Sequence, residues 1–363
     1  MIYIIKKMYR TLGEYINIDL EIRGVEPIFN HINIPNEYPD DLNIIKSLEY
    51  AAAIHKEVRR TLQPCIKPGI KLKEIAEIIE LKTQELSNES KSINKGIGFP
   101  VGLSINECTA HWHPNSNDRS ILKKDDIIKI DFGTEVNGWI IDSAFTISFT
   151  PKYDPLINAV KEATKTGIKN IGMDVNIVDW GKEIQEVMES YEIILDGKLY
   201  PIRSIRNLGG HNIKKGIIHG GMFLPIVNLK NTLPSNYRFK EGVYAVETFG
   251  STGNNTVVES NDSNLYRINP NNIHNINELK LNSTKKLLNQ INKSFSTLPF
   301  TDRYVETFNF SNYKTNLNIL TTHNYLHSYP PLCVNKGAYT AQYEHTLYID
   351  NDKKIVFSNG EDY

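Results

Sequence analysis

The stretch that most constrains the fold is KIDFGTEVNGWIID (residues 129–142), in which Asn137-Gly138 separates two strand-like runs. An Asn-Gly pair between apolar runs is the strongest short-range signal for a two-residue β-hairpin. Such a loop places Asp131 opposite Ala144, so that Asp142 lies on the same face as Asp131, one diagonal step away. The predicted hairpin therefore directs two carboxylates to one side.

Two carboxylates on one strand face allow two interpretations. Strand faces are usually half buried, and like charges that converge there raise one pKa or repel unless a cation lies between them. Aspartate is, however, mainly a residue of surfaces and turns, so one of the two could be solvated at a sheet edge while the other caps a turn. The rest of the chain has to decide between these interpretations.

Composition and charge limit the classes of partner. The chain has 363 residues, and 41 Lys and Arg against 42 Asp and Glu leave a net charge of -1. This balance gives no reason to expect a specific nucleic acid or an acidic membrane as the main partner. Cys65, Cys108 and Cys333 form no CxxC pair, which argues against a disulfide scaffold or a thiolate zinc site and fits a reducing compartment.

The start of the chain carries no targeting pattern. The apolar run Met1–Ile5 is interrupted by Lys6 and Lys7, too soon for the core of a signal peptide, and no stretch approaches the length of a membrane span. We therefore expect a cytoplasmic protein without a membrane partner.

Helical and strand-like patterns alternate in blocks along the chain. Apolar residues recur at helical spacing from Leu42 to Leu62, ahead of Pro64, whereas residues 101–149 and 245–249 have the character of strands. Further helices are predicted at about 72–86, 154–170 and 177–191. This order predicts an α+β fold with a curved antiparallel sheet.

The domain organisation follows from two changes in composition. Residues 1–41 have no long periodic pattern and are interpreted as an N-terminal extension, and residues 42–363 form the main domain. Asparagine becomes frequent from about residue 254 while helical spacing persists, so residues of about 259–328 are predicted to form a small helical insert subdomain.

Three further polar residues lie in apolar or glycine-bounded surroundings, namely His211, Glu247 and Glu344. Taken singly, each has an ordinary explanation as a core histidine or a strand acid that faces water. Together with Asp131 and Asp142 they form a set of four carboxylates and one imidazole. Such a set offers oxygen-rich coordination for two divalent cations and balances their four positive charges. A metal pair would explain why acids are tolerated on a sheet face.

With these residues in place, the chain resembles the type 2 methionine aminopeptidases, a group of the pita-bread metallopeptidases. The resemblance covers nearly everything from residue 42 to the C-terminus. The matching stretches are GFPVGLSINECTAHWHPN (98–115), IIKIDFGTEVNGWIIDSAFTISF (127–149), IRNLGGHNIKKGIIHGG (205–221), GVYAVETFGSTG (242–253) and YPPLCVNKGAYTAQYEHT (329–346).

The resemblance implies a role for each of the five candidate ligands. Asp131 would chelate one metal with both oxygens, and Asp142 and Glu344 would bridge the two ions. His211 and Glu247 would complete the second site. Glu247 would in addition act in catalysis by moving a proton from the attacking water to the leaving nitrogen.

The resemblance also implies a substrate pocket. His111 would face the metals, contact the substrate and assist proton transfer, and His219 would hydrogen-bond the bound peptide. Phe99, Ile218 and Tyr329 would form walls of the pocket for the methionine side chain.

The implied fold is the pita-bread fold, with a curved antiparallel sheet flanked by helices, and the implied activity is removal of the initiator methionine when the second residue is small. The cofactors would be two divalent ions, for which manganese, cobalt, iron and zinc suit the ligands about equally well. The partners would be the N-termini of nascent peptides. A monomer is expected. Transient ribosome contact is weakly supported, because the charged N-terminal segment of many relatives is missing.

Two relatives of the same fold remain as alternatives. A non-catalytic pita-bread protein that binds RNA or protein would have lost metal ligands, whereas all five and His111 are present here. A proline-specific aminopeptidase of the superfamily would carry a large domain ahead of the first helix, for which about 40 residues leave no room. Partial likenesses to amidohydrolase, kinase and lipase motifs lack the companion motifs that those enzymes need.

Overall fold

The computed structural model describes residues 43–87, 96–260 and 263–360, and the predicted N-terminal extension lies outside them. The predicted hairpin consists of β3 (Ile127–Val136) and β4 (Trp139–Ser148). Asp131 pairs with Ala144 and Asp142 with Gly133, so the register expected from the two-residue turn is confirmed.

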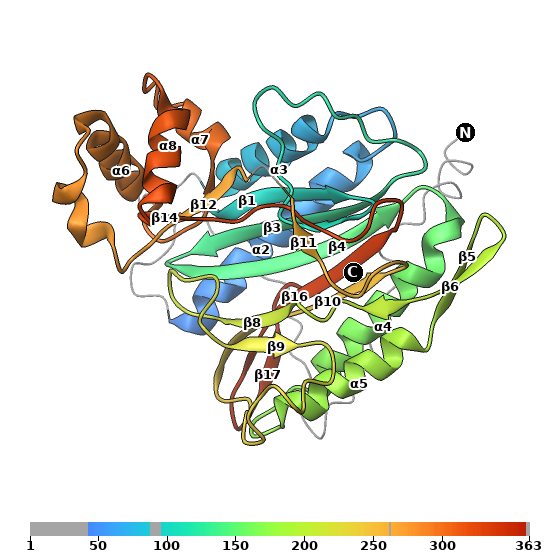
Figure 1. The fold of residues 1–363 in the computed structure, drawn as a ribbon. Coiled ribbons are helices and arrows are strands. Elements are labelled where there is room, and N and C mark those ends of the chain that lie inside the picture. Colours follow the sequence, from blue (N-terminus) through green and yellow to red (C-terminus); the bar gives the residue numbers. More distant parts are fainter. Residues whose placement is uncertain (1–42, 88–95, 261–262, 361–363) are drawn as a thin grey trace.

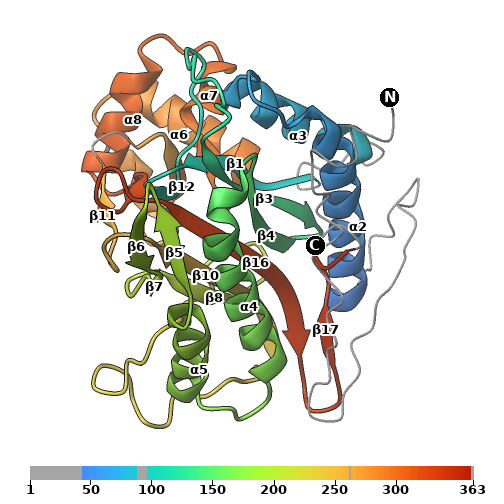
Figure 2. The ribbon, with the colours of Figure 1, turned by 90° about the vertical axis from the view of Figure 1, so that its right-hand side faces the viewer.

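Two antiparallel sheets form the centre of the molecule. In the first, β1 (Gly96–Ile105) lies beside β3, in the order β1-β3-β4. The second has the order β17-β16-β10-β8-β9, with β7 also paired to β10. Its strands are β7 (Arg203–Ser204), β8 (Gly209–Ile213), β9 (Phe223–Pro225), β10 (Gly242–Ser251), β16 (Thr340–Ile349) and β17 (Lys354–Val356). The two sheets meet where β4 lies beside β16, which produces the continuous curved surface seen in Figures 1 and 2.

Two helix pairs cover the outer side of these sheets. On the first sheet lie α2 (Ile44–Leu62) and α3 (Leu72–Ser87), and on the second lie α4 (Asp154–Asn170) and α5 (Ile177–Glu189) (Figure 2). The Asn43 side chain accepts a hydrogen bond from the backbone N–H of Lys46 at the start of α2, as an N-cap does. Buried residues at helical spacing, such as Leu48, Ile75 and Val160, join the helices to the main core. Leu81, which the helical pattern had included, is 65% exposed.

The Asn-rich region forms a compact group of short elements at one end of the sheets (Figure 1). They are β12 (Leu265–Ile268), the 3-10 helix Ile273–Glu278, α6 (Asn282–Phe295), β13 (Phe300–Thr301), α7 (Asp302–Glu306), α8 (Tyr313–Thr322) and β14 (Leu326–Ser328). Their apolar side chains, among them Leu287, Ile291 and Phe300, make a hydrophobic cluster of their own. The boundaries predicted for the insert stay a prediction.

Short strands complete the described chain. The hairpin of β5 (Glu192–Leu195) and β6 (Lys198–Pro201) follows α5, and β11 (Val258–Glu259), β15 (Leu332–Cys333) and β2 (Cys108–Ala110) form a small sheet. Within the described ranges, none of the helices combines the length and the apolar character needed to cross a membrane.

Candidate metal centre

The five candidate ligands come from five strands and lie together. Asp131 is on β3, Asp142 on β4, His211 on β8, Glu247 on β10 and Glu344 on β16. Glu247 is paired with Glu344 across β10 and β16, and His211 is paired with Ala245 one strand further. Since side chains alternate along a strand, these registers place the three second-sheet groups on one face.

Contacts among the side chains define a compact cluster. His211 Nε2 lies 3.4 Å from Asp142 Oδ2 and 3.8 Å from Glu247 Oε1. One candidate donor atom from each of Asp142, His211 and Glu344 lies within 4.8 Å of the others, close enough for a single cation to contact all of them.

Gln342 connects the remaining carboxylates and was missed by the sequence analysis. Its Nε2 donates to Asp131 Oδ2 at 3.2 Å, to Glu247 Oε2 at 3.3 Å and to Glu344 Oε2 at 3.5 Å. A usable signal was present in the sequence. Gln342 stands two positions before Glu344 on the same strand, so the period of two places both side chains on one face.

The electrostatics of the cluster fit a divalent metal. Burial, followed by the charge of Asp142, holds the pKa values of Asp131, Glu247 and Glu344 well above the ordinary range of carboxyl groups. Asp131 Oδ1 and Glu344 Oε1 are buried and have no hydrogen-bond partner. Acceptor oxygens that are clustered, buried and unpartnered are the ligands that a hard or borderline divalent cation requires.

A pocket opens over these carboxylates and contains every site residue that was predicted from the sequence. Its lining residues are Phe99, Gly102, His111, His113, Asp131, Asp142, His211, Ile218, His219, Glu247, Leu265, Pro299, Tyr329 and Glu344. Leu265 and Pro299 belong to the Asn-rich region, from which no pocket residue had been assigned. His113 had not been assigned to the site from the sequence.

His111 lies at the pocket in a strained backbone conformation, with φ of 63°. Its ring meets that of Tyr329 edge-on, with the ring centroids 6.0 Å apart. The ring centroids of Tyr329 and His219 are 6.1 Å apart. The ring centroids of His219 and His211 are 4.5 Å apart. Desolvation lowers the pKa of His111 from 6.5 to about 4, against the opposing charge of Asp142, so the imidazole is neutral at physiological pH.

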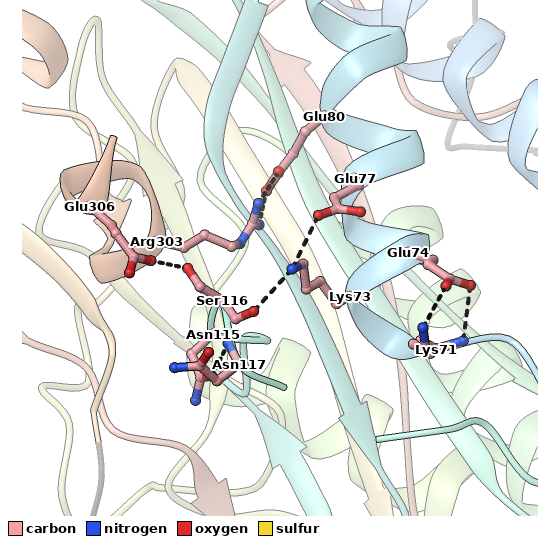
Figure 3. Close-up of polar contacts among 10 residues, drawn as sticks. All are labelled: Lys71, Lys73, Glu74, Glu77, Glu80, Asn115, Ser116, Asn117, Arg303 and Glu306. Carbon is pink, nitrogen blue, oxygen red and sulfur yellow. Dashed lines mark hydrogen bonds and ion pairs between the residues drawn. The ribbon is translucent and has the colours of Figure 1, made fainter. Parts of the chain in front are cut away.

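The Asn-rich region is held to α3 by the ion pair of Arg303 with the buried Glu80 (Figure 3). Arg303 Nη1 and Nη2 donate to the two oxygens of Glu80 at 2.7 and 2.6 Å, and Tyr304 Oη donates to Glu80 Oε1 at 2.6 Å. Nearby, the Ser116 hydroxyl donates to Glu306. These contacts fix the elements that contribute Leu265 to the pocket wall.

Comparisons with known proteins agree on the fold and on the kind of enzyme. A model of metallopeptidase family M24 matches residues 46–258. Methionine aminopeptidase 2-2 of Aspergillus niger is 46% identical over 327 residues, which cover 88% of this chain and 74% of that protein. Methionine aminopeptidase 2 of Verticillium alfalfae is 47% identical over 333 residues, with coverage of 89% and 74%.

Solved structures share the fold at lower identity. A thermophilic Arx1 has a TM-score of 0.72 at 17% identity and covers 88% of this chain and 91% of that chain. A methionine aminopeptidase from Rickettsia prowazekii has a TM-score of 0.55 at 17% identity, with coverage of 87% and 96%. The pita-bread fold predicted from the sequence is thereby confirmed.

Proposed function

The chain belongs to metallopeptidase family M24, within its methionine aminopeptidase 2 group, and we propose that it removes the initiator methionine from nascent peptides in the cytoplasm when the second residue is small. The observation that carries the proposal is the single pocket that joins the carboxylate cluster to Phe99, Ile218 and Tyr329. Acidic ligands and an apolar wall thus lie within reach of one bound N-terminal residue.

Divalent metal binding is a property of the family, and we assign two ions to this site. Asp131 would hold one ion, Asp142 and Glu344 would bridge both, and His211 with Glu247 would complete the second site. Bound divalent ions supply a nucleophilic hydroxide near neutral pH and positive charge for the oxyanion. The identity of the ions, among manganese, cobalt, iron and zinc, is left to the experiment below.

We assign proton transfer to two residues of the chain. The Glu247 carboxylate accepts the proton that the attacking water releases and passes it to the leaving nitrogen. His111 is neutral, and its one N–H donates to the backbone of Pro330, so its other ring nitrogen can accept a hydrogen bond from the substrate. His219, at the rim of the same pocket, would hydrogen-bond the peptide backbone.

The methionine side chain would lie against Phe99, Ile218, Tyr329 and Leu265. An apolar pocket distinguishes side chains that differ by one methylene by only about 1–3 kcal/mol. The preference for methionine is therefore expected to be graded. A monomeric state and a transient contact with the ribosome belong to the same proposal as expectations.

Peptide hydrolysis tests the proposal. Metal-free protein is supplied with manganese, cobalt, iron or zinc under reducing, oxygen-free conditions and incubated with Met-Ala and Met-Gly peptides. Release of free methionine with at least one ion is expected, whereas no turnover with any of them contradicts the proposal. Cleavage of Xaa-Pro peptides in place of Met-Ala would identify a proline-specific enzyme.

Removing a bridging ligand is the sharpest variant test. Asp142→Ala is expected to abolish both metal retention and methionine release, because each ion loses a ligand. The matched control is Asp352→Ala, which removes an exposed aspartate from the turn between β16 and β17 and should change neither property. Activity retained by Asp142→Ala would show that the bridge is wrongly assigned.

A further inference from the structure

Side chains join the two sheets of the metal centre where β4 lies beside β16. β4 is the edge strand of the first sheet, and β16 belongs to the second. β4 carries Asp142, and β16 carries Gln342 and Glu344. The relative position of these two strands therefore determines the distance between the ligands that the two halves of the molecule contribute.

Two threonine hydroxyls form a reciprocal contact across this boundary. Thr346 Oγ1 accepts a hydrogen bond from the backbone N–H of Asp142 at 2.7 Å and donates one to the backbone C=O of the same residue at 2.7 Å. In the opposite direction, Thr146 Oγ1 accepts from the backbone N–H of Gln342 at 2.8 Å and donates to its C=O at 2.7 Å. Each threonine thus satisfies both backbone groups of one residue on the facing strand.

The two contacts are placed symmetrically about Glu344. Thr346 lies two residues beyond Glu344 on β16, and Gln342 lies two residues before it. Between them, Ser143 Oγ donates to the backbone C=O of Glu344 at 2.8 Å. Three hydroxyls therefore hold the backbones of Asp142, Gln342 and Glu344, in positions where an ordinary sheet would have a backbone ladder.

These hydroxyls are inaccessible to water. Thr346 and Ser143 are 0% exposed and Thr146 is 3% exposed. Buried backbone N–H and C=O groups need partners, and a hydroxyl can serve as donor and acceptor at once. A hydroxyl also keeps the strands further apart than a direct backbone bond would.

From this geometry, and resting on the function proposed above, we propose that Thr146 and Thr346 are positioning residues that set the spacing of the metal ligands across the sheet boundary. Thr346 fixes the backbone from which Asp142 extends. Thr146 fixes the backbone of Gln342, whose amide donates to Asp131, Glu247 and Glu344. Both threonines lie outside the pocket lining and act through the residues they hold.

Valine is the appropriate replacement, because it keeps the branched shape and removes the hydroxyl. Thr346→Val and Thr146→Val are each expected to lower the affinity for Mn²⁺ by about 10- to 100-fold, as is usual when the outer partners of metal ligands are lost. Thr346→Ser retains the hydroxyl and is expected to bind Mn²⁺ like the wild type. The affinity is measured by titration calorimetry on full-length, metal-free protein.

Thr134→Val is the matched control. Thr134 is also 0% exposed and its hydroxyl donates to the backbone of Ala51 at 2.7 Å, but this bond joins β3 to the helix α2 and does not connect two ligand-bearing strands. The control is expected to lower the melting temperature and to leave the Mn²⁺ affinity unchanged. This separates a positioning role from a general loss of stability.

The possible results are distinguishable. Unchanged Mn²⁺ affinity in Thr346→Val and Thr146→Val, with melting temperatures lowered as in Thr134→Val, overturns the positioning role and leaves the proposed function intact. Should Thr346→Val fail to fold, as shown by circular dichroism, Thr146→Val decides the question. A wild-type protein that binds none of the four candidate metals would contradict the proposed function itself.

Discussion

His111 has a φ of 63°, a conformation that costs a non-glycine residue about 1–3 kcal/mol and persists only where the surrounding structure enforces it. The neighbouring backbone supplies that constraint. Leu103 N–H donates to the carbonyl of Trp112 at 2.8 Å, and Ser104 Oγ accepts from Trp112 N–H at 3.3 Å. These hydrogen bonds therefore hold the strained backbone, and with it the imidazole, at the pocket where substrate binds according to our proposal.

The substitution His111→Asn tests the role of the imidazole separately from that of the backbone strain. Asparagine tolerates the left-handed region better than most residues, so His111→Asn removes the ring without adding backbone cost. We expect kcat for Met-Ala peptides to fall by about 10²- to 10⁴-fold, with Mn²⁺ affinity unchanged. His323→Asn, at an exposed histidine, is the control. Wild-type kcat in His111→Asn would remove His111 from the proposed mechanism.

Gly133 allows the Phe99 ring to lie against the ligand hairpin. A Cβ at this position would come within 2.3 Å of two atoms of that ring. Gly133→Ala is therefore expected to displace the pocket wall at an overpacking cost of about 1–3 kcal/mol. Steady-state kinetics should show a higher KM for Met-Ala peptides. Gly172→Ala, whose Cβ would have its nearest neighbour at 3.6 Å, should leave KM unchanged. A normal KM in Gly133→Ala would mean that Phe99 does not line the methionine site.

At the scale of single elements, the parts of the fold with local signals were predictable. The turn at Asn137-Gly138 determined the register of β3 and β4, and helical spacing located α2 and α4. The junction of β4 with β16 has no such signal. Its contacts run through Thr146, Thr346 and Ser143, and hydroxyl residues in a strand are common without any such role.

The contact between α3 and α7 yields a prediction for an element. Glu80 is buried and holds Arg303 through two hydrogen bonds, so Glu80→Ala leaves the Arg303 guanidinium, whose side chain is 13% exposed, without its partner. Breaking such a pair costs about 3–5 kcal/mol, and the unfolding temperature should fall accordingly. KM should rise as well, because the elements beside α7 carry Leu265.

Glu77→Ala provides the comparison on the same helix. Glu77 is 43% exposed and lies 3.7 Å from Lys73, so its loss should cost at most about 1 kcal/mol. Equal unfolding temperatures for Glu80→Ala and Glu77→Ala would show that the insert does not depend on this ion pair.

At the scale of the whole molecule, more of the candidate site than of its surroundings could be predicted from the sequence. The predicted ligands and pocket residues share one pocket. The ligands could be predicted because acids that are expensive to bury stand out in apolar strands, whereas the pocket residues came from the family resemblance. Leu265, Pro299 and Gln342 did not stand out. Apolar and amide residues are ordinary in any strand or loop, and the docking of the insert on α3 brings Leu265 and Pro299 to the site through contacts between residues far apart in sequence.

The raised carboxyl pKa values yield a prediction for the stability of the whole protein. In the metal-free fold, Asp131, Glu247 and Glu344 hold protons that the unfolded chain releases above its ordinary pKa of about 4. Their contribution to stability is therefore present at low pH and is lost as the pH rises through the raised values. Metal ligation requires the deprotonated groups, so metal affinity increases over the same range.

We therefore expect added Mn²⁺ to raise the melting temperature more at about pH 7.5 than at about pH 5.5, with a stabilisation near 4 kcal/mol when the ion is at about 1,000 times its Kd. The increment is the quantity to measure, because burial also lowers the pKa values of His113 and His345 to about 3. These histidines stay neutral in the fold and become charged in the unfolded chain below about pH 6.5, which destabilises the metal-free and metal-loaded protein alike. Asp142→Ala should show no increment at either pH. An increment in the wild type that is equal at both pH values would mean that the carboxylates are already ionised before the metal binds.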